Sequence, residues 1–337
     1  MVASMIDERT AVAVVGPTCS GKTVVAVELA KLVNGEVISA DARQIYKMID
    51  IGTAKPTREE MSGVEHHLVD ILPLENEMSA GAYAELAAKV VDKIFARNRI
   101  PVIVGGSGLY LRALIDGLFD APEVDPDVRH MLRERVHQEG SATLLEELKR
   151  VDAVAAEGLI PQNYSRILRA LEVYHSSGKK ISELRNERPS VIRFSTIQFG
   201  IRLNRNLLYS RIEKRVDEMI RNGFVHEVKD ILDRGVDPKL NSLQTVGYKE
   251  VISYLQARKD GATPESPDEK FGEVVSLIKM NTRRYAKRQM TWFNKDKRIF
   301  WIDADDKSAR EVAEDMFTTF ANSKAADAGS AISEKGV

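Results

Sequence analysis

Apolar and polar positions follow two kinds of pattern in the first hundred residues. Helical spacing occurs at residues 23–33 and 80–97, where apolar side chains recur among charged ones. Before, between and after these segments lie apolar runs of strand length, at Ala11–Val15, Glu36–Ala40, His67–Leu72 and Pro101–Val104. Buried strands that alternate with helices predict a parallel sheet covered on both faces. Ligands of such sheets bind beyond the carboxyl ends of the strands.

The pattern becomes almost wholly helical between about residues 122 and 178, with helices expected at 128–138, 143–151 and 165–176. Residues 195–203 are again extended, and 297–303 predict a last strand. Further helices are expected at 207–222, 224–234 and 273–294. We therefore predict an α/β core from residues 1–118 and 195–321 and a helical insertion at 119–194. The small, polar segment 322–337 is expected to be a disordered tail.

The composition limits the possible compartment and binding partners but does not indicate a function. The 337 residues are 43% hydrophobic and 29% charged, with a formal net charge of -1, so a nucleic-acid partner would have to meet a local basic patch. Cys19 is the single cysteine, which excludes an intramolecular disulfide and favours a reducing cytoplasm. The first ten residues lack an apolar leader, and the apolar runs are too short to cross a membrane.

A phosphate-binding loop follows the first strand. Its residues are Gly16, Pro17, Thr18, Cys19, Ser20, Gly21, Lys22 and Thr23, which match G-x-x-x-x-G-K-[ST]. The glycines let backbone N–H groups converge on phosphate oxygens, and the following helix adds its positive end. Lys22 supplies a full charge, and the Thr23 hydroxyl is placed for Mg²⁺. The motif predicts a P-loop NTPase-like sheet but does not define the reaction.

The partners of a nucleotide-hydrolysing site are incomplete. Pro101–Val104 ends in glycine, where a hydrolase usually carries a carboxylate that helps to hold Mg²⁺. Asp41 does follow a strand, and small-molecule kinases place an aspartate near this point to contact an acceptor hydroxyl. Asp41 could equally cap the turn that begins at Ala42. Position alone does not separate these two interpretations.

Several strings, taken together, resemble the bacterial tRNA dimethylallyltransferases, also called tRNA isopentenyltransferases. They span most of the chain: the loop Gly16–Thr23 and residues 39–46, 50–56, 105–110, 166–172, 246–248 and 287–292. The resemblance implies transfer of a dimethylallyl group from dimethylallyl diphosphate to N6 of adenosine 37, in tRNAs that read codons beginning with U. It implies Mg²⁺ as cofactor, the tRNA anticodon stem-loop as partner, and a monomer.

The resemblance also assigns roles to residues. Lys22, Thr23 and Arg215 would grip the diphosphate, and Asp41 would accept a proton from the adenine amine. The positions that match tRNA contacts are Asp41, Ala42, Arg43, Gln44, Ser107, Arg129, Ser165, Arg166, Ile167, Leu168, Arg169, Gln244, Thr245, Val246, Gly247, Tyr248 and Lys249. Many members carry serine at position 42 and threonine at 107. Ser107 keeps the hydroxyl, whereas Ala42 does not.

Residues 279–298 form a strongly basic segment with interleaved aromatics, in which Asp296 is the single acid. One face of this helix is expected to pack and the other to meet RNA phosphates. His66 and His67 lack a third ligand at metal-binding spacing, so we interpret them as structural residues or as polar residues at the edge of the pocket.

Three other functions fit parts of the sequence. An adenylate isopentenyltransferase would use the same donor on AMP, but it needs neither the helical insertion nor the basic segment. A small-molecule kinase would use ATP at the same loop. A non-catalytic RNA-binding module is disfavoured by the intact Lys22, Thr23 and Asp41.

Overall fold

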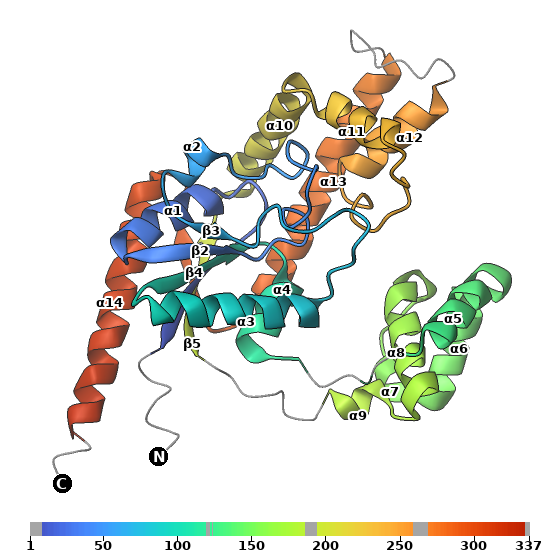
Figure 1. The fold of residues 1–337 in the computed structure, drawn as a ribbon, viewed down its shortest axis with the longest axis horizontal. Coiled ribbons are helices and arrows are strands. Elements are labelled where there is room, and N and C mark those ends of the chain that lie inside the picture. The colour runs from blue at the N-terminus through green and yellow to red at the C-terminus, as the bar shows by residue number, and fades with distance from the viewer. Residues whose placement is uncertain (1–8, 119–121, 123, 186–193, 259–268, 334–337) are drawn as a thin grey trace. The chain divides into compact units, whose positions relative to one another are not determined.

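A six-stranded sheet organises the chain, which the computed structural model describes at residues 9–118, 122, 124–185, 194–258 and 269–333. The strand order is β3-β2-β4-β1-β5-β6, and all neighbouring pairs are parallel (Figure 1). The strands are β1 (Thr10–Val15), β2 (Gly35–Ser39), β3 (His66–His67), β4 (Ile100–Gly105), β5 (Ser195–Arg202) and β6 (Ile299–Asp303). The predicted α/β fold with a parallel sheet is confirmed.

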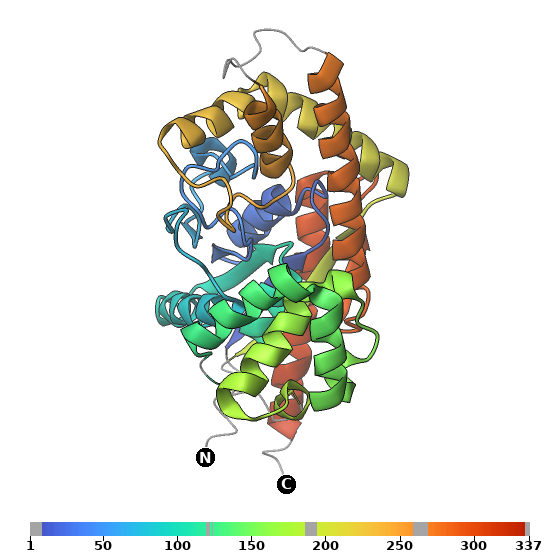
Figure 2. The ribbon, with the colours of Figure 1, turned by 90° about the vertical axis from the view of Figure 1, so that its right-hand side faces the viewer.

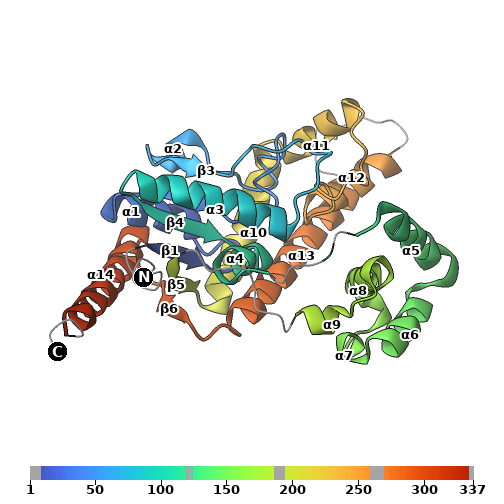
Figure 3. The same ribbon diagram turned by 60° about the horizontal axis from the view of Figure 1, so that its bottom comes forward.

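Alternate residues of β1 face two apolar clusters on opposite sides of the sheet. Ala11, Ala13 and Val15 belong to one cluster, while Val12 and Val14 belong to the other. The first cluster includes side chains of α3 (Ala80–Ala96), α11 (Phe224–Asp233) and α12 (Tyr248–Ala257). The second includes α1 (Lys22–Leu32) and α14 (Ala309–Ser333), which pack against each other. Figure 3 shows α3 lying along the sheet beside β4. Burial on both faces explains why the strands read as continuous apolar runs.

Three of the remaining helices of the core lie toward the carboxyl edge of the sheet, namely α4 (Gly108–Asp116), α10 (Arg205–Arg221) and α13 (Glu269–Phe293). The short α2 (Arg58–Met61) instead precedes β3 and lies beside α1. The long helix α13 packs against α10 and α12 (Figure 2). No helix among the described residues is long and apolar enough to cross a membrane.

Two segments differ from the sequence-based expectation. The strand expected at His67–Leu72 stops after His67, because Leu68 and Asp70 adopt positive φ angles of 61° and 59° that interrupt an extended chain. Leu72 keeps only an isolated bridge to Tyr46. In the segment from residue 322, where a disordered tail was expected, α14 extends to Ser333, and residues 334–337 lie outside the described part of the chain.

The chain divides into two compact units, Met1–Ile115 with Arg193–Val337, and Asp116–Ile192. The second unit is helical and was expected at 119–194. It contains α5 (Pro126–Glu139), α6 (Ser141–Val151), α7 (Ala153–Ala156), α8 (Tyr164–Ser177), α9 (Ile181–Leu184) and a 3₁₀ turn at Pro161–Asn163. An apolar core of its own, which includes Leu132, Leu148 and Leu171, holds these helices together.

Candidate active site

The phosphate-binding loop leaves β1 and enters α1 through two left-handed residues. Cys19 has φ of 63° and Gly21 has φ of 87°. Such turns let consecutive N–H groups point to one side, which suits an anion at a helix N-terminus. Ser20 is 2% exposed, and its Oγ has no hydrogen-bond partner in the described structure. A buried hydroxyl of this kind suits a phosphate oxygen, which would satisfy it.

Lys22 is half-buried at the first residue of α1, and its Nζ donates to the Pro17 carbonyl at 2.6 Å. Burial lowers the pKa of Lys22 to about 8, while the nearby Asp41 charge opposes that shift. An incoming diphosphate would stabilise the ammonium form and raise this pKa.

Arg215, on α10, also contacts the phosphate-binding loop. Its Nη1 donates to Thr18 Oγ1 at 3.0 Å, and its Nη2 donates to the Thr53 carbonyl at 3.2 Å. Two contacts fix the plane of the guanidinium. A planar group held beside the loop can bind two phosphate oxygens at once.

Asp41 follows β2 and shapes the turn after it. Its Oδ1 accepts from the backbone N–H groups of Arg43, at 2.8 Å, and Gln44, at 3.3 Å. Residues 42–45 form a turn rather than a helix, so Asp41 caps a turn. Ser107 Oγ accepts from the Ala42 N–H at 2.9 Å, which ties this turn to the loop after β4.

A pocket of about 340 Å³ joins these elements within the first unit. Its lining includes many of the predicted site residues: Thr18, Asp41, Ala42, Arg43, Ser107, Arg215, Gln244, Thr245, Val246 and Lys249. Gly247 and Tyr248 follow in the chain but are buried. The Tyr248 ring packs edge-on against Phe224, with centroids 5.0 Å apart, and its hydroxyl donates to Glu227 at 2.5 Å. Tyr248 therefore supports the pocket from behind rather than facing it.

Two residues of α13 belong to the site although neither was predicted from the sequence to have a role there. Gln289 is 6% exposed; its Oε1 accepts from the Thr18 N–H at 2.8 Å, and its Nε2 donates to the Gly106 carbonyl at 2.9 Å. A Cβ at Gly106 would lie 2.2 Å from that Nε2, so any side chain at this position would displace the Gln289 amide. Tyr285 lines the pocket, and burial raises its pKa to about 12, which keeps the phenol protonated.

Comparison with known proteins identifies the family. The sequence model described as IPP transferase matches residues 44–296. The chain belongs to the IPP transferase family. It is 41% identical to tRNA dimethylallyltransferase 1 of Pelobacter propionicus, over 87% of this chain and 92% of that one. It is 42% identical to tRNA dimethylallyltransferase 2 of Geotalea uraniireducens, over 90% and 95%.

Solved structures support the same family assignment. A full-length tRNA isopentenylpyrophosphate transferase from Bacillus halodurans has a TM-score of 0.69 and 37% identity, covering 96% of this chain and 98% of its own. A eukaryotic dimethylallyltransferase described as acting on tRNA has a TM-score of 0.74 and 27% identity, covering 88% of this chain and 74% of its own.

The helical unit of this IPP transferase family member holds the other predicted contacts. Ser165 and Arg166 are exposed at the start of α8, whereas the Ile167 and Leu168 side chains are in that unit's core. Arg129 and Arg169 share the carboxylate of Glu172, at 3.4 and 3.7 Å. Ile167 and Leu168 therefore anchor α8 in the core of the helical unit, which positions the polar residues beside them in the chain.

The basic helix α13 has the two faces expected of it. Ala286, Gln289 and Phe293 are buried, while Arg284, Lys287 and Arg288 are exposed. Two further basic residues pair with α10, Lys279 with Asp217 and Arg283 with Glu213, both at 2.7 Å.

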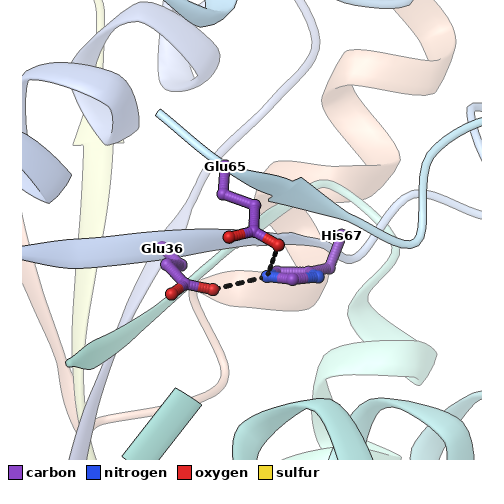
Figure 4. A group of neighbouring side chains, drawn as sticks. All are labelled: Glu36, Glu65 and His67. Atoms are coloured by element: carbon purple, nitrogen blue, oxygen red, sulfur yellow. Dashed lines mark hydrogen bonds and ion pairs between the residues drawn. The ribbon is translucent and has the colours of Figure 1, made fainter. Parts of the chain in front are cut away.

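Two places in the structure could be considered for a metal ion, and the phosphate-binding loop suits one better than the acidic cluster on β2 does. Thr23 and the unpartnered Ser20 offer hydroxyl oxygens beside the expected phosphates. Glu36, Glu65 and His67 also form a cluster (Figure 4). It lies at the start of β2, whereas Asp41 follows the end of that strand. The Glu36 carboxylate is already paired there with Arg97 and Arg99, at 2.5 and 3.4 Å, and with His67 at 2.7 Å. The two guanidinium groups neutralise Glu36, which makes the cluster a structural ion-pair group.

Proposed function

We propose that this protein transfers the dimethylallyl group of dimethylallyl diphosphate to N6 of adenosine 37 in tRNAs that read codons beginning with U. One observation carries the proposal: a single pocket is lined both by Thr18 and Arg215, which suit a diphosphate, and by Asp41, which suits a proton acceptor. Both substrates would meet in that space.

The donor half of the reaction develops negative charge on the leaving group. As the bond between C1 of the donor and the diphosphate oxygen breaks, charge accumulates on that oxygen. Lys22, Arg215 and the N–H groups of the loop would stabilise this charge more strongly in the transition state than in the ground state. Mg²⁺ bound at Thr23 would neutralise part of the same charge.

The acceptor half needs a base, because the lone pair of an adenine amine is delocalised into the ring. N6 forms a bond to C1 of the donor, diphosphate leaves, and the N6 proton passes to the Asp41 carboxylate. The target base must leave the anticodon-loop stack to enter the pocket. Tyr285 and Arg288 lie together there, with the guanidinium carbon 5.7 Å from the ring centroid, and would replace the lost stacking.

The tRNA would be held by two surfaces. Arg284, Lys287 and Arg288 on α13 would meet its backbone, and Arg129 with residues 165–169 would contact it from the helical unit. The substrate and the single, half-buried Cys19 fit the cytoplasm.

The decisive test incubates the protein with unmodified tRNA, dimethylallyl diphosphate and Mg²⁺, and measures the mass of adenosine 37 after nuclease digestion. The proposal requires a gain of one dimethylallyl group in place of one hydrogen. Parallel reactions replace tRNA with AMP, and the donor with labelled ATP. Prenylated AMP without prenylated tRNA, or phosphate transfer from ATP, would show that the acceptor or the donor has been assigned wrongly.

A further inference from the structure

Glu227 binds a loop that contributes to the pocket, although Glu227 does not line the pocket itself. Its Oε2 accepts from the backbone N–H groups of Asp50 and Ile51, at 2.9 and 2.7 Å. Its Oε1 accepts from the Gly52 N–H at 3.2 Å and from the Tyr248 hydroxyl at 2.5 Å. One carboxylate thus gathers three consecutive N–H groups, which strongly restricts the path of the loop.

Packing restricts the same loop from its other side. A Cβ at Gly52 would lie 2.3 Å from the Phe224 ring and 2.4 Å from the Tyr248 ring, so the backbone passes directly over both. Phe224 and Glu227 both belong to α11, and Tyr248 begins α12. The loop is therefore fixed to two helices rather than to the sheet.

Thr53, the next residue, connects this fixed loop to the site. The Thr53 carbonyl accepts from Arg215 Nη2 and from Gln44 Nε2, each at 3.2 Å. Arg215 is expected to bind the diphosphate and Gln44 to contact tRNA. Gln44 has a second acceptor, the Ala54 carbonyl, at 2.9 Å. Arg215 likewise has a second partner, Thr18 Oγ1 at 3.0 Å, so the Thr53 carbonyl is one of the two contacts that fix the guanidinium plane.

We propose that Glu227 is a positioning residue for diphosphate binding, acting through the loop 50–53 and the Thr53 carbonyl on Arg215. The inference rests on the proposed function. A guanidinium that is held in one plane binds its oxygens without first losing rotational freedom, and a small displacement weakens both bonds. The negative charge of Glu227 is required because an amide would present an NH₂ group to N–H donors on one of its two sides.

The experiment compares Glu227→Gln with Glu227→Asp and with the control Asp230→Asn, which removes a charge from the exposed side of the same helix. We expect Glu227→Gln to raise KM for the donor about tenfold, with a smaller change in KM for tRNA. Glu227→Asp keeps both oxygens and should recover part of the loss. Asp230→Asn should match the wild type.

A double-mutant cycle separates positioning from general weakening of the fold. Arg215→Lys removes the group on which Glu227 acts, so adding Glu227→Gln should raise the donor KM further by less than about twofold. Binding of inorganic diphosphate, measured by calorimetry without tRNA, should weaken in the same order of variants, and Glu227→Asp carries the comparison if Glu227→Gln does not fold. Unchanged donor KM and diphosphate affinity in folded Glu227→Gln, or multiplying effects in the cycle, would overturn the inference. The proposed function fails separately, if the wild type does not prenylate tRNA.

Discussion

The lowered pKa of Lys22 makes the affinity for the donor depend on pH within an accessible range. Lys22 is expected to hold the diphosphate as an ammonium ion, and burial lowers its pKa to about 8 in the unliganded protein. The sign follows directly. Raising the pH through 8 removes the proton that the diphosphate requires, so binding must take up a proton and becomes weaker.

The size of the effect follows from one titrating proton. With a pKa of about 8, roughly nine-tenths of Lys22 is protonated at pH 7 and roughly one-tenth at pH 9. If only the protonated form binds, Kd rises about tenfold over this range, or about 1.4 kcal/mol. An unperturbed lysine would remain almost fully charged at pH 9 and would give nearly no change.

The assay is calorimetric titration of the protein with dimethylallyl diphosphate between pH 7 and 9, without tRNA. Lys22→Arg is the matched control, because a guanidinium stays charged throughout and the ionisation of the donor itself affects both proteins equally. The wild type should lose affinity about tenfold more than Lys22→Arg across the range. Equal slopes for the two proteins would refute the reasoning that Lys22 titrates near pH 8 and that its charge holds the diphosphate.

Three other perturbations test separate parts of the site. Asp41→Asn should lower kcat by about 10² to 10⁴ and leave tRNA affinity unchanged; undiminished turnover would remove Asp41 as the base. Gln289→Met should cost about 1 kcal/mol in urea unfolding, because it removes the hydrogen bond to the half-buried Thr18 N–H, and should weaken diphosphate binding. A variant with unaltered unfolding would contradict that hydrogen bond. Lys287→Ala should reduce the dependence of log Kd for tRNA on log salt concentration by about one, and an unchanged slope would place Lys287 away from the phosphates.

The sequence predicted most of the fold because parallel strands are buried on both faces. β1 and β4 therefore appear as almost continuous apolar runs, and glycine follows each of them. Failures occurred where local backbone geometry decided the outcome. The positive φ angles of Leu68 and Asp70, both unusual outside glycine, end β3 and have no marker in apolar periodicity.

The site also contains some residues that could be predicted from the sequence and others that could not. The loop Gly16–Thr23 was predictable because contiguous residues perform its chemistry. The hydrogen bonds of Gln289 and Glu227 were not predictable, because their partners lie 271 and 175 to 177 positions away in the chain. A glutamine on a basic helix and a glutamate on an amphipathic one have the composition of an ordinary exposed surface. Only folding shows that one binds the Thr18 N–H and the other three loop N–H groups.

The two interpretations of Asp41 that the sequence left open are compatible in the structure. Oδ1 accepts both hydrogen bonds of the turn, from the N–H groups of Arg43 and Gln44, and neither bond uses Oδ2. Asp41 also lines the pocket. Capping with one oxygen holds the carboxylate in a single orientation, so the second oxygen can meet the adenine amine without a further loss of side-chain freedom. Asparagine at this position keeps the capping oxygen and replaces the basic one, so Asp41→Asn tests the base role while preserving the turn.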